Sequence, residues 1–346
     1  MHKVTLIPGD GIGPEITQVV IEVFDKLKAP ISWEMVDAGA KAIKKYGTPL
    51  PEVVLESIKR NKVALKGPIT TPVGEGFRSV NVTLREKLNL YANLRPVKSL
   101  PGINNKFEKI DLVIIRENTE CLYKGIEYSI DESTSCAVRV ITRAASEKIA
   151  KYAFDYARRH DRKKVTAVHK ANIQKLTDGL FLQSIRNISN NYPEVEYEEK
   201  IVDNMSMQLV LNPEKYDVIV CPNLYGDILS DLAAGLIGGL GLAPGANIGD
   251  EIAVFEAVHG SAPDIAGKGI ANPIALLRSS VMLLEYLEEY QLAKKLEFAI
   301  EKAVEDKNIL TPDLKGKGTT ESLKNKIISM LDLWKMVGDL FEWKYL

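Results

Sequence analysis

Short apolar runs of strand length alternate with amphipathic stretches of helical length along most of the chain. The apolar runs predict strands at 3–8, 30–37, 63–67, 111–116, 165–168, 196–203 and 216–221, and a further short strand is predicted just before Glu256. Apolar residues recur at helical spacing in 16–27, 51–60, 81–88, 146–159, 177–188, 207–211, 226–235, 274–288, 290–304 and 320–336. Strands that alternate with helices predict an α/β fold.

The composition is that of an ordinary globular protein, with 45% hydrophobic and 26% charged residues. The 346 residues are enough for two domains or for one large α/β domain. A net charge of −1 provides no basic field for nucleic acid or an anionic membrane, so neither is expected as a partner. No apolar run reaches the length that a membrane span needs.

Three widely spaced cysteines, Cys121, Cys136 and Cys221, argue against a disulfide framework and a zinc site. The chain starts directly with a predicted strand, and no signal peptide is recognisable. We therefore expect a cytoplasmic protein.

Two carboxylates, Asp227 and Asp231, share one face of the helix predicted after the strand 216–221. They repel each other unless a cation lies between them, and carboxylates are ligands for Mg²⁺ and Mn²⁺. An isolated pair at this spacing is more often a helix cap and a solvated side chain. The charged residues elsewhere in the chain favour the metal site.

The glycines at 9, 11 and 13 follow the first strand and resemble a dinucleotide-binding fingerprint. The third glycine comes one position too early, and a proline follows at the helix start. We therefore interpret residues 8–15 as a tight turn without a Rossmann role.

Asn81 and Arg85 lie four residues apart on one predicted helix, where an amide and a guanidinium can grip a carboxylate. Ser79 or Asn81 could instead be the N-cap of that helix. Arg116, Lys170 and Asp203 each follow or end a predicted strand, which indicates that charged groups gather at one edge of the sheet. Lys170 could instead extend to the surface.

The sequence also predicts the structure of two further segments. Residues 125–142 alternate as strands do but have little to cover them, which predicts a hairpin that pairs with a second subunit or remains exposed. Residues 234–249 are rich in glycine and predict a return connection between domains. Asp264, on a loop beside glycines, could accept hydrogen bonds from a ribose diol and would repel a 2′-phosphate.

Five motifs resemble those of the β-decarboxylating dehydrogenases, which act on isocitrate, homoisocitrate or 3-isopropylmalate. They are Tyr-Ala-Asn-Leu-Arg-Pro (91–96), Arg-Glu-Asn-Thr-Glu (116–120), His-Lys-Ala-Asn (169–172), Tyr-Gly-Asp-Ile-Leu-Ser-Asp (225–231) and His-Gly-Ser-Ala-Pro-Asp-Ile-Ala-Gly-Lys (259–268). The resemblance implies a non-Rossmann fold with two α/β domains, the first discontinuous (1–98 and 245–346) and the second (99–244) carrying a dimer-clasping arm at about 125–142. It also implies a homodimer or higher homo-oligomer with shared active sites, in which the other subunit donates Lys170 and Asp203.

The same resemblance assigns roles to residues. Substrate contacts are implied for Ser79, Asn81, Arg85, Arg95, Arg116, Tyr123 and Lys170. Ligation of Mg²⁺ or Mn²⁺ is implied for Asp203, Asp227 and Asp231. Cofactor contacts are implied for Ile69, Thr70, Thr71, Asn172, Glu256, His259, Gly260, Ser261, Ala262, Asp264, Ile265 and Asn272. Lys170 would remove the hydroxyl proton, and Tyr123 would protonate the enol carbon after CO₂ leaves.

Ser79 and Asn81 resemble the isocitrate type, because an isopropyl group would leave a buried hydroxyl and amide without partners. Asp264 with Ile265 resembles the NAD type. We therefore expect NAD-dependent oxidation of isocitrate to 2-oxoglutarate and CO₂, with homoisocitrate and then 3-isopropylmalate as alternatives. A catalytically silent regulatory chain is the alternative outside catalysis. Cys121 departs from the residues that many relatives have beside Tyr123.

Overall fold

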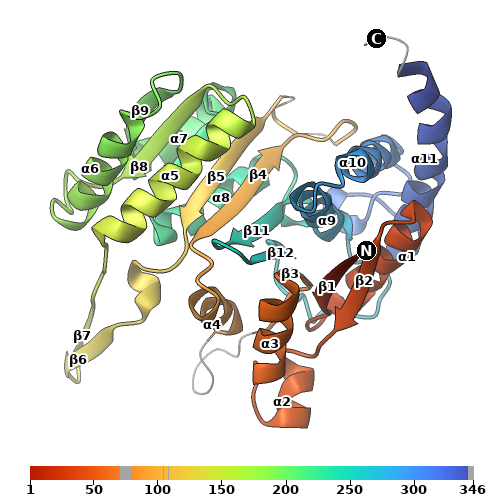
Figure 1. Ribbon diagram of the computed structural model, residues 1–346, viewed down its shortest axis with the longest axis horizontal. Coiled ribbons are helices and arrows are strands. Elements are labelled where there is room, and N and C mark those ends of the chain that lie inside the picture. Colours follow the sequence, from red (N-terminus) through yellow and green to blue (C-terminus); the bar gives the residue numbers. More distant parts are fainter. Residues whose placement is uncertain (71–78, 104, 108, 342–346) are drawn as a thin grey trace.

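A ten-stranded sheet forms the centre of the molecule (Figure 1). The computed structural model describes residues 1–70, 79–103, 105–107 and 109–341, with the side chains of the last helix described up to residue 334. The strand order is β2-β1-β3-β12-β11-β4-β5-β10-β8-β9. The strands are β1 (His2–Ile7), β2 (Ile31–Met35), β3 (Val63–Lys66), β4 (Ala92–Lys98), β5 (Asp111–Glu117), β8 (Lys164–His169), β9 (Glu196–Ile201), β10 (Val218–Cys221), β11 (Pro244–Ile248) and β12 (Ala253–Ala257).

The two halves of this sheet run in opposite directions. Strands β2, β1, β3 and β12 are mutually parallel, and so are β5, β10, β8 and β9. Between them, β11 is antiparallel to both β12 and β4, and β4 is antiparallel to β5. The expectation that Arg116, Lys170 and Asp203 gather at one edge agrees with these strand directions, because β5, β8 and β9 are parallel and their carboxyl ends lie at the same edge. The carboxyl end of β3 lies at the opposite edge.

Helices cover both halves of the sheet (Figure 1). Helices α1, α9, α10 and α11 gather beside the half that contains β1 and β12, whereas α5 and α8 pack against β5. The helices are α1 (Gly13–Leu27), α2 (Ala40–Tyr46), α3 (Glu52–Asn61), α4 (Val80–Lys87), α5 (Arg143–Arg159), α6 (Thr177–Ser189), α7 (Val202–Leu211), α8 (Asn223–Leu236), α9 (Ile274–Tyr286), α10 (Tyr290–Val304) and α11 (Thr320–Phe341). One apolar core runs through both halves.

The predicted α/β class is confirmed, and most predicted elements agree with the structure within a few residues. Three elements were not predicted, namely α2, β4 and β11. The glycine-rich segment 234–249 is not only a connection, because β11 forms within it. Asp203 lies in the first turn of α7 and not in a strand.

The division into two domains stays a prediction. Strands from 1–98 and from the region after 245 occupy one end of the sheet, and strands from 99–244 occupy the other. The pairing of β11 with both β12 and β4 makes the sheet continuous across that boundary.

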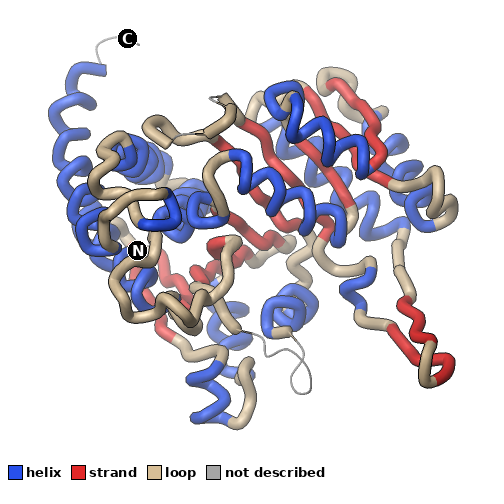
Figure 2. Tube along the Cα trace, turned by 180° about the vertical axis from the view of Figure 1, so that it is seen from behind, coloured by secondary structure: helices blue, strands red, loops and turns tan. Residues whose placement is uncertain are grey.

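The hairpin of β6 (Glu127–Asp131) and β7 (Thr134–Ala137) projects from the body as a separate two-stranded sheet (Figure 2). Tyr128 and Ile130 on it are exposed. Apolar side chains in this position need a partner to become buried. Among the described residues, no helix is long and apolar enough to cross a membrane.

Candidate active site

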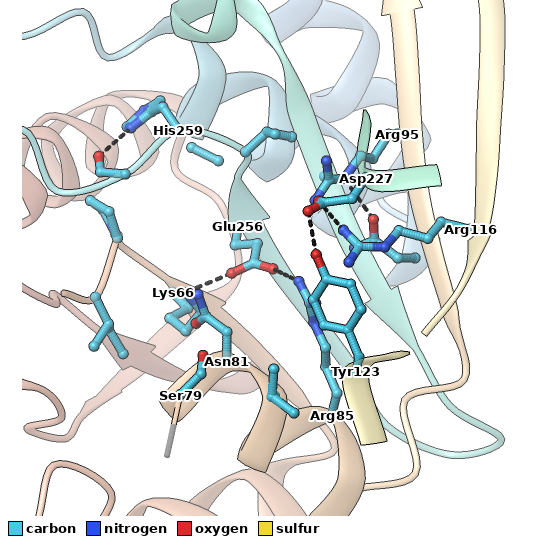
Figure 3. A pocket seen from close by; sticks show the side chains of 18 residues that line it. Lys66, Ser79, Asn81, Arg85, Arg95, Arg116, Tyr123, Asp227, Glu256 and His259 are labelled. Carbon is cyan, nitrogen blue, oxygen red and sulfur yellow. Dashed lines mark hydrogen bonds and ion pairs between the residues drawn. The ribbon is translucent and has the colours of Figure 1, made fainter. Parts of the chain in front are cut away.

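A cavity of about 230 Å³ lies where the two halves of the sheet meet (Figure 3). Its lining combines strand residues with one turn of α4 and the start of α8. The polar and charged residues that line it are Lys66, Ser79, Asn81, Arg85, Asn93, Arg95, Arg116, Tyr123, Asp227, Glu256 and His259. Six of the seven predicted substrate-binding residues are in this set, and the seventh, Lys170, is not.

Strand register explains why charged residues far apart in the sequence meet here. Lys66 pairs directly with Glu256, and Asn93 pairs directly with Arg116. Arg95 lies two residues after Asn93 on β4, so its side chain points to the same face of the sheet. The antiparallel strands β4 and β11 thus bring the ends of β3 and β5 to one cavity.

Arg116 is the most deeply buried cation of the cavity, with 1% of its surface exposed. Its Nε and Nη2 donate to Asn223 Oδ1 at 2.9 and 2.6 Å, and its Nη1 donates to Asp227. The Tyr123 hydroxyl also donates to Asp227, and the Tyr123 ring centroid lies 4.9 Å from the Arg116 guanidinium carbon. Burial opposes ionisation of Asp227, but the Arg116 charge outweighs it, and the pKa of Asp227 is lowered.

Arg95 lies beside Arg116 and has the same kind of partners. Its Nη1 donates to Ser230 Oγ at 2.5 Å and lies 3.3 Å from Asp231 Oδ1, and its Nη2 lies 3.5 Å from Asp227 Oδ1. Burial and the nearby Arg116 charge lower the pKa of Arg95 to about 10. Buried guanidinium groups this close together make the cavity a strong site for a multiply charged anion.

The opposite wall of the cavity is built around Glu256. Its Oε2 lies 2.6 Å from Lys66 Nζ, and its Oε1 lies 3.6 Å from Arg85 Nη2. Burial disfavours its charged form, but Lys66 and Arg85 prevail and lower the pKa of Glu256 to about 2. Asn81 Oδ1 and Arg85 Nε are buried and find no hydrogen-bond partner among the described residues. Such atoms mark a place for a polar ligand.

Ser79 occupies the N-cap position of α4, which agrees with one of the sequence alternatives, although its side chain forms no capping hydrogen bond. Ser79 also lines the cavity. Asn81 lies inside the first turn of the helix.

A row of buried asparagine side chains joins the two walls. Asn247 Nδ2 donates to Glu256 Oε1 at 2.6 Å, and Asn247 Oδ1 accepts from Asn93 Nδ2 at 2.8 Å. Asn93 Oδ1 in turn accepts from Arg95 Nε at 2.7 Å. Asn93 and Asn247 were not predicted from the sequence, because an asparagine in a strand that was not predicted carries no signal of its own.

Lys66 was also missed, although the signal that identified Arg116 could have found it. It is a cation at the end of a fully buried strand, with its side chain 3% exposed. A buried lysine is costly unless it meets an anion, which here is Glu256.

The three predicted metal ligands do not meet within one chain. Asp227 and Asp231 lie on one face of α8 as expected, whereas Asp203 pairs with Lys170, whose Nζ is 2.7 Å from Asp203 Oδ1. Neither Lys170 nor Asp203 lines the cavity. Among the described residues, no group of three His, Cys, Asp or Glu side chains could hold a metal ion.

The donor chemistry of α8 nevertheless suits a hard divalent cation, since two carboxylates lie one helical turn apart and one of them, Asp227, lines the cavity. Burial and the neighbouring Asp227 raise the pKa of Asp231 even though Arg95 opposes the shift. Asp203, the third predicted ligand, could join them only from another copy of the chain.

A second cavity, of about 620 Å³, adjoins the first and shares His259 and Gly260 with it. Its lining is mostly apolar, with Ile12, Ala262 and Ile265 among its residues, and its polar contributions include Asn272 and Asp313. A largely apolar cleft with a few polar groups fits a nucleotide base and sugar. Asp313, which accepts from Asn272 Nδ2 at 2.9 Å, was not predicted from the sequence.

The other predicted cofactor residues are distributed unevenly. Ile69 and Glu256 line the first cavity. The Thr70 hydroxyl lies 2.6 Å from the Ser261 hydroxyl, and neither of these residues lines the first or the second cavity. Asp264 is exposed, on the loop that contributes Ala262 and Ile265 to the second cavity. Asn172 is exposed on the turn that carries Lys170. Thr71 lies outside the described residues.

The tight glycine turn supports this second cavity. A side chain at Gly11 would place its Cβ 1.9 Å from the carbonyl oxygen of Ser261, and Gly11 has a φ of +57°. Ile12 N donates to the same carbonyl oxygen at 2.8 Å. The turn at 8–15 therefore holds the loop that begins at His259.

Cys121, the departure noted in the sequence, is fully buried and has a φ of +72° and a ψ of −147°. This region of backbone conformation is strained for any residue with a Cβ, and strained residues cluster at functional sites. Cys121 N donates to Val140 O at 2.8 Å, which fixes the segment that leads to Tyr123.

Comparison with known proteins gives one consistent result. Residues 3–327 match the family model described as isocitrate/isopropylmalate dehydrogenase. The alpha chain of a probable mitochondrial NAD isocitrate dehydrogenase of Drosophila melanogaster is 49% identical over 95% of this chain and 87% of its own length. A 3-isopropylmalate dehydrogenase of Archaeoglobus fulgidus is 47% identical over 96% of this chain and 100% of its own length.

A solved structure agrees with these relatives. The crystal structure of isocitrate dehydrogenase from Methylococcus capsulatus is similar with a TM-score of 0.93 at 52% identity, covering 96% of this chain and 99% of that one.

Proposed function

Because the chain belongs to the isocitrate/isopropylmalate dehydrogenase family, we propose that it oxidises isocitrate with NAD and releases CO₂ to give 2-oxoglutarate. Family membership makes it a dehydrogenase, and the choice of acid is our proposal. The relatives are named for both substrates at similar identity, so their names do not decide between the two.

The observation that carries the proposal is the polar wall beside three buried arginines. Arg85, Arg95 and Arg116 suit an anion with several carboxylates. Asn81 Oδ1 and Arg85 Nε lie in the same place with no partner among the described residues. A third carboxylate can accept from the Arg85 Nε–H and from the Asn81 amide N–H, whereas an isopropyl group would leave the buried Arg85 Nε without a partner.

The chain's own residues would divide the work as follows. Arg95 and Arg116 hold carboxylates of the substrate, and Tyr123, whose hydroxyl now donates to Asp227, lies beside them. Lys170 of a second copy removes the proton of the 2-hydroxyl group. After oxidation, the bond to the β-carboxylate breaks, CO₂ leaves, and Tyr123 gives a proton to the enol carbon.

Two groups would be bound from solution. Asp227 and Asp231, with Asp203 of a second copy, would hold Mg²⁺ or Mn²⁺, and the second cavity would hold NAD. The cation supplies polarisation of the C2 oxygen, and NAD accepts the hydride.

We further propose a homodimer with shared sites, since Lys170 and Asp203 lie outside the cavity of their own chain. Some relatives are named as parts of larger enzymes, including a regulatory chain of the mitochondrial NAD isocitrate dehydrogenase of Dictyostelium discoideum. This chain has all the catalytic and metal-binding side chains that the proposed reaction needs, which favours a catalytic chain over a silent one.

For the compartment, the three cysteines are unpaired, which is usual in reducing surroundings. A cytoplasmic location stays our prediction, and the mitochondrial location in the names of several relatives belongs to those proteins.

The experiment is a comparison of kcat/KM for isocitrate, homoisocitrate and 3-isopropylmalate with the chain purified alone and with NAD and Mg²⁺ present. We expect a clear preference for isocitrate. Preference for 3-isopropylmalate would refute the role of Asn81, and absence of activity with all three acids would indicate that the chain needs a different partner chain.

A further inference from the structure

Arg139 follows the projecting hairpin, and its side chain is only 9% exposed although the proposed reaction does not use it. Its Nη2 lies 2.7 Å from Oδ1 of Asp178, an ion pair that is not aligned as a hydrogen bond. Asp178 is fully buried in the first turn of α6. Its Nη1 donates to the Tyr225 hydroxyl at 2.8 Å and to Gln174 Oε1. The guanidinium carbon also lies 4.7 Å from the Tyr225 ring centroid.

Two of these partners flank the turn that carries Lys170. Asp178 Oδ2 accepts from the backbone N–H of Lys170 at 2.5 Å. The carbonyl oxygen of Lys170 accepts from the N–H groups of Ile173 and Gln174 at 3.0 and 2.9 Å. One guanidinium therefore contacts both residues that fix the backbone of Lys170 on its two sides.

The remaining contacts connect Arg139 with the cavity of its own chain. Tyr225 lies on α8 two residues before Asp227. Val140, the neighbour of Arg139, forms a β-bridge with Cys121, two residues before Tyr123. Arg139 is thus joined to segments that lead to Asp227, to Tyr123 and to Lys170.

The chemistry of this contact requires an arginine. A buried carboxylate such as Asp178 is costly without a cation, and a planar guanidinium can serve several acceptors at once. A lysine at this position would keep the charge, but it has no planar fork with which to hold Gln174, Tyr225 and Asp178 together.

We propose that Arg139 and Asp178 are positioning residues that hold the backbone of Lys170 in a fixed relation to helix α8. The catalytic consequence rests on the proposed function. In a dimer with shared sites, Lys170 of one copy lies in the cavity of the other copy, whereas Asp227 lies in the cavity of its own chain. The Arg139–Asp178 pair would then connect residues that belong to two different active sites.

The test uses the full-length chain with Arg139→Met and Asp178→Asn combined. The double change leaves no single buried charge, and the amide oxygen that replaces the carboxylate can still accept from the N–H of Lys170. The matched control is Arg162→Met with Asp217→Asn. That pair lies 3.0 Å apart at the opposite end of β8, and Asp217 likewise accepts from a lysine N–H, that of Lys163.

The first measurement does not need substrate. The protein is acetylated briefly with an amine-reactive ester, and modification of Lys170 is quantified by peptide mass spectrometry relative to exposed Lys41. We expect the Arg139/Asp178 variant to label Lys170 at least about threefold faster than wild type, because its pairing with Asp203 is loosened. The control should label as wild type does.

The second measurement is steady-state kinetics with isocitrate and NAD. Misplacement of a reacting group by about 1 Å can cost about a hundredfold in rate, so we expect kcat to fall at least about tenfold with KM for NAD little changed. The single variant Arg139→Lys, which keeps the buried positive charge, should have a kcat between those of the double variant and of wild type.

Labelling of Lys170 equal to wild type would overturn the proposal, and so would faster labelling with unchanged kcat. If wild type oxidises none of the three acids, the proposed function fails, and the labelling result alone decides whether Arg139 and Asp178 position Lys170.

Discussion

Lys170 Nζ lies 2.7 Å from Asp203 Oδ1, and neither side chain lines the cavity that contains Asp227. Asp203 is 68% exposed at its side chain, and Lys170 is 27% exposed. Exposure of a pair with this chemistry is of little use to a single chain, because surface ion pairs contribute little to stability. It is useful if a second copy of the chain covers the pair with its own cavity.

The first prediction concerns the role of Asn81 in substrate choice. Asn81→Leu should lower kcat/KM for isocitrate by about a hundredfold or more and raise the relative rate with 3-isopropylmalate, because the polar wall would be lost. The measurement is the ratio of kcat/KM for the two acids. Val82→Leu, in the same cavity, is the matched control and should lower both values without changing the ratio. An unchanged ratio for Asn81→Leu would assign selectivity to other residues.

The second prediction concerns the contribution of Arg116 to catalysis. Arg116→Met removes a buried partner of Asp227 and a substrate ligand. We expect kcat/KM to fall roughly 150-fold, which corresponds to the loss of about 3 kcal/mol of transition-state stabilisation. Arg158→Met, which breaks an exposed pair with Glu194, should change it by less than about 0.5 kcal/mol. Equal losses in both variants would show that Arg116 has only a structural role.

Removal of metal makes the third prediction. Chelation should abolish activity, and Mg²⁺ or Mn²⁺ should restore it. At about 100 times its Kd, a cation stabilises the folded protein by about 2.7 kcal/mol, so the thermal midpoint of wild type should rise when Mn²⁺ is added. In Asp231→Asn this rise should largely disappear, whereas Asp313→Asn should keep it. A full rise in Asp231→Asn would remove Asp231 from the ligand set.

The fourth prediction concerns the cofactor. Asp264 is exposed on the loop that contributes Ala262 and Ile265 to the second cavity. Replacing Asp264 by Lys and Ile265 by Tyr should shift kcat/KM from NAD towards NADP, because a cation would replace an anion near the site of a 2′-phosphate. Asp250→Lys, an exposed aspartate elsewhere, should not change the preference. An unchanged NAD preference in the double variant would show that this loop does not select the cofactor.

The pattern of apolar residues predicted most of the fold because buried parallel strands contain uninterrupted apolar runs, as in the centre of β5 and the whole of β10. It missed β4 and β11 for the opposite reason. Each carries a buried asparagine whose side chain is satisfied only by partners from distant segments, as when Asn93 donates to Asn247. Long-range polar pairing of this kind leaves no local periodicity.

The candidate site shows the same division. Charges at the ends of buried strands, such as Arg116, were recognisable because an unpaired cation is costly there. The pairing of β3 with β12 was not recognisable, and this pairing places Lys66 beside Glu256, which also lies near Arg85. Arg139 was also missed, since its importance comes from contacts with Gln174, Asp178 and Tyr225 that only the folded chain brings together.

The central claim is that each active site combines Asp227 of one copy with Lys170 of another. Lys170→Met and Asp227→Asn should each be nearly inactive as a homodimer. Co-expression with two different affinity tags allows purification of the mixed dimer, in which one site has both defects and the other has neither.

The most direct measurement is kcat of that doubly tagged mixed dimer with isocitrate, NAD and Mg²⁺. Shared sites predict about half of the wild-type kcat per dimer, because one of the two sites is intact. A mixed dimer no more active than its two inactive parents would contradict shared sites and indicate that Lys170 and Asp227 act within the same chain.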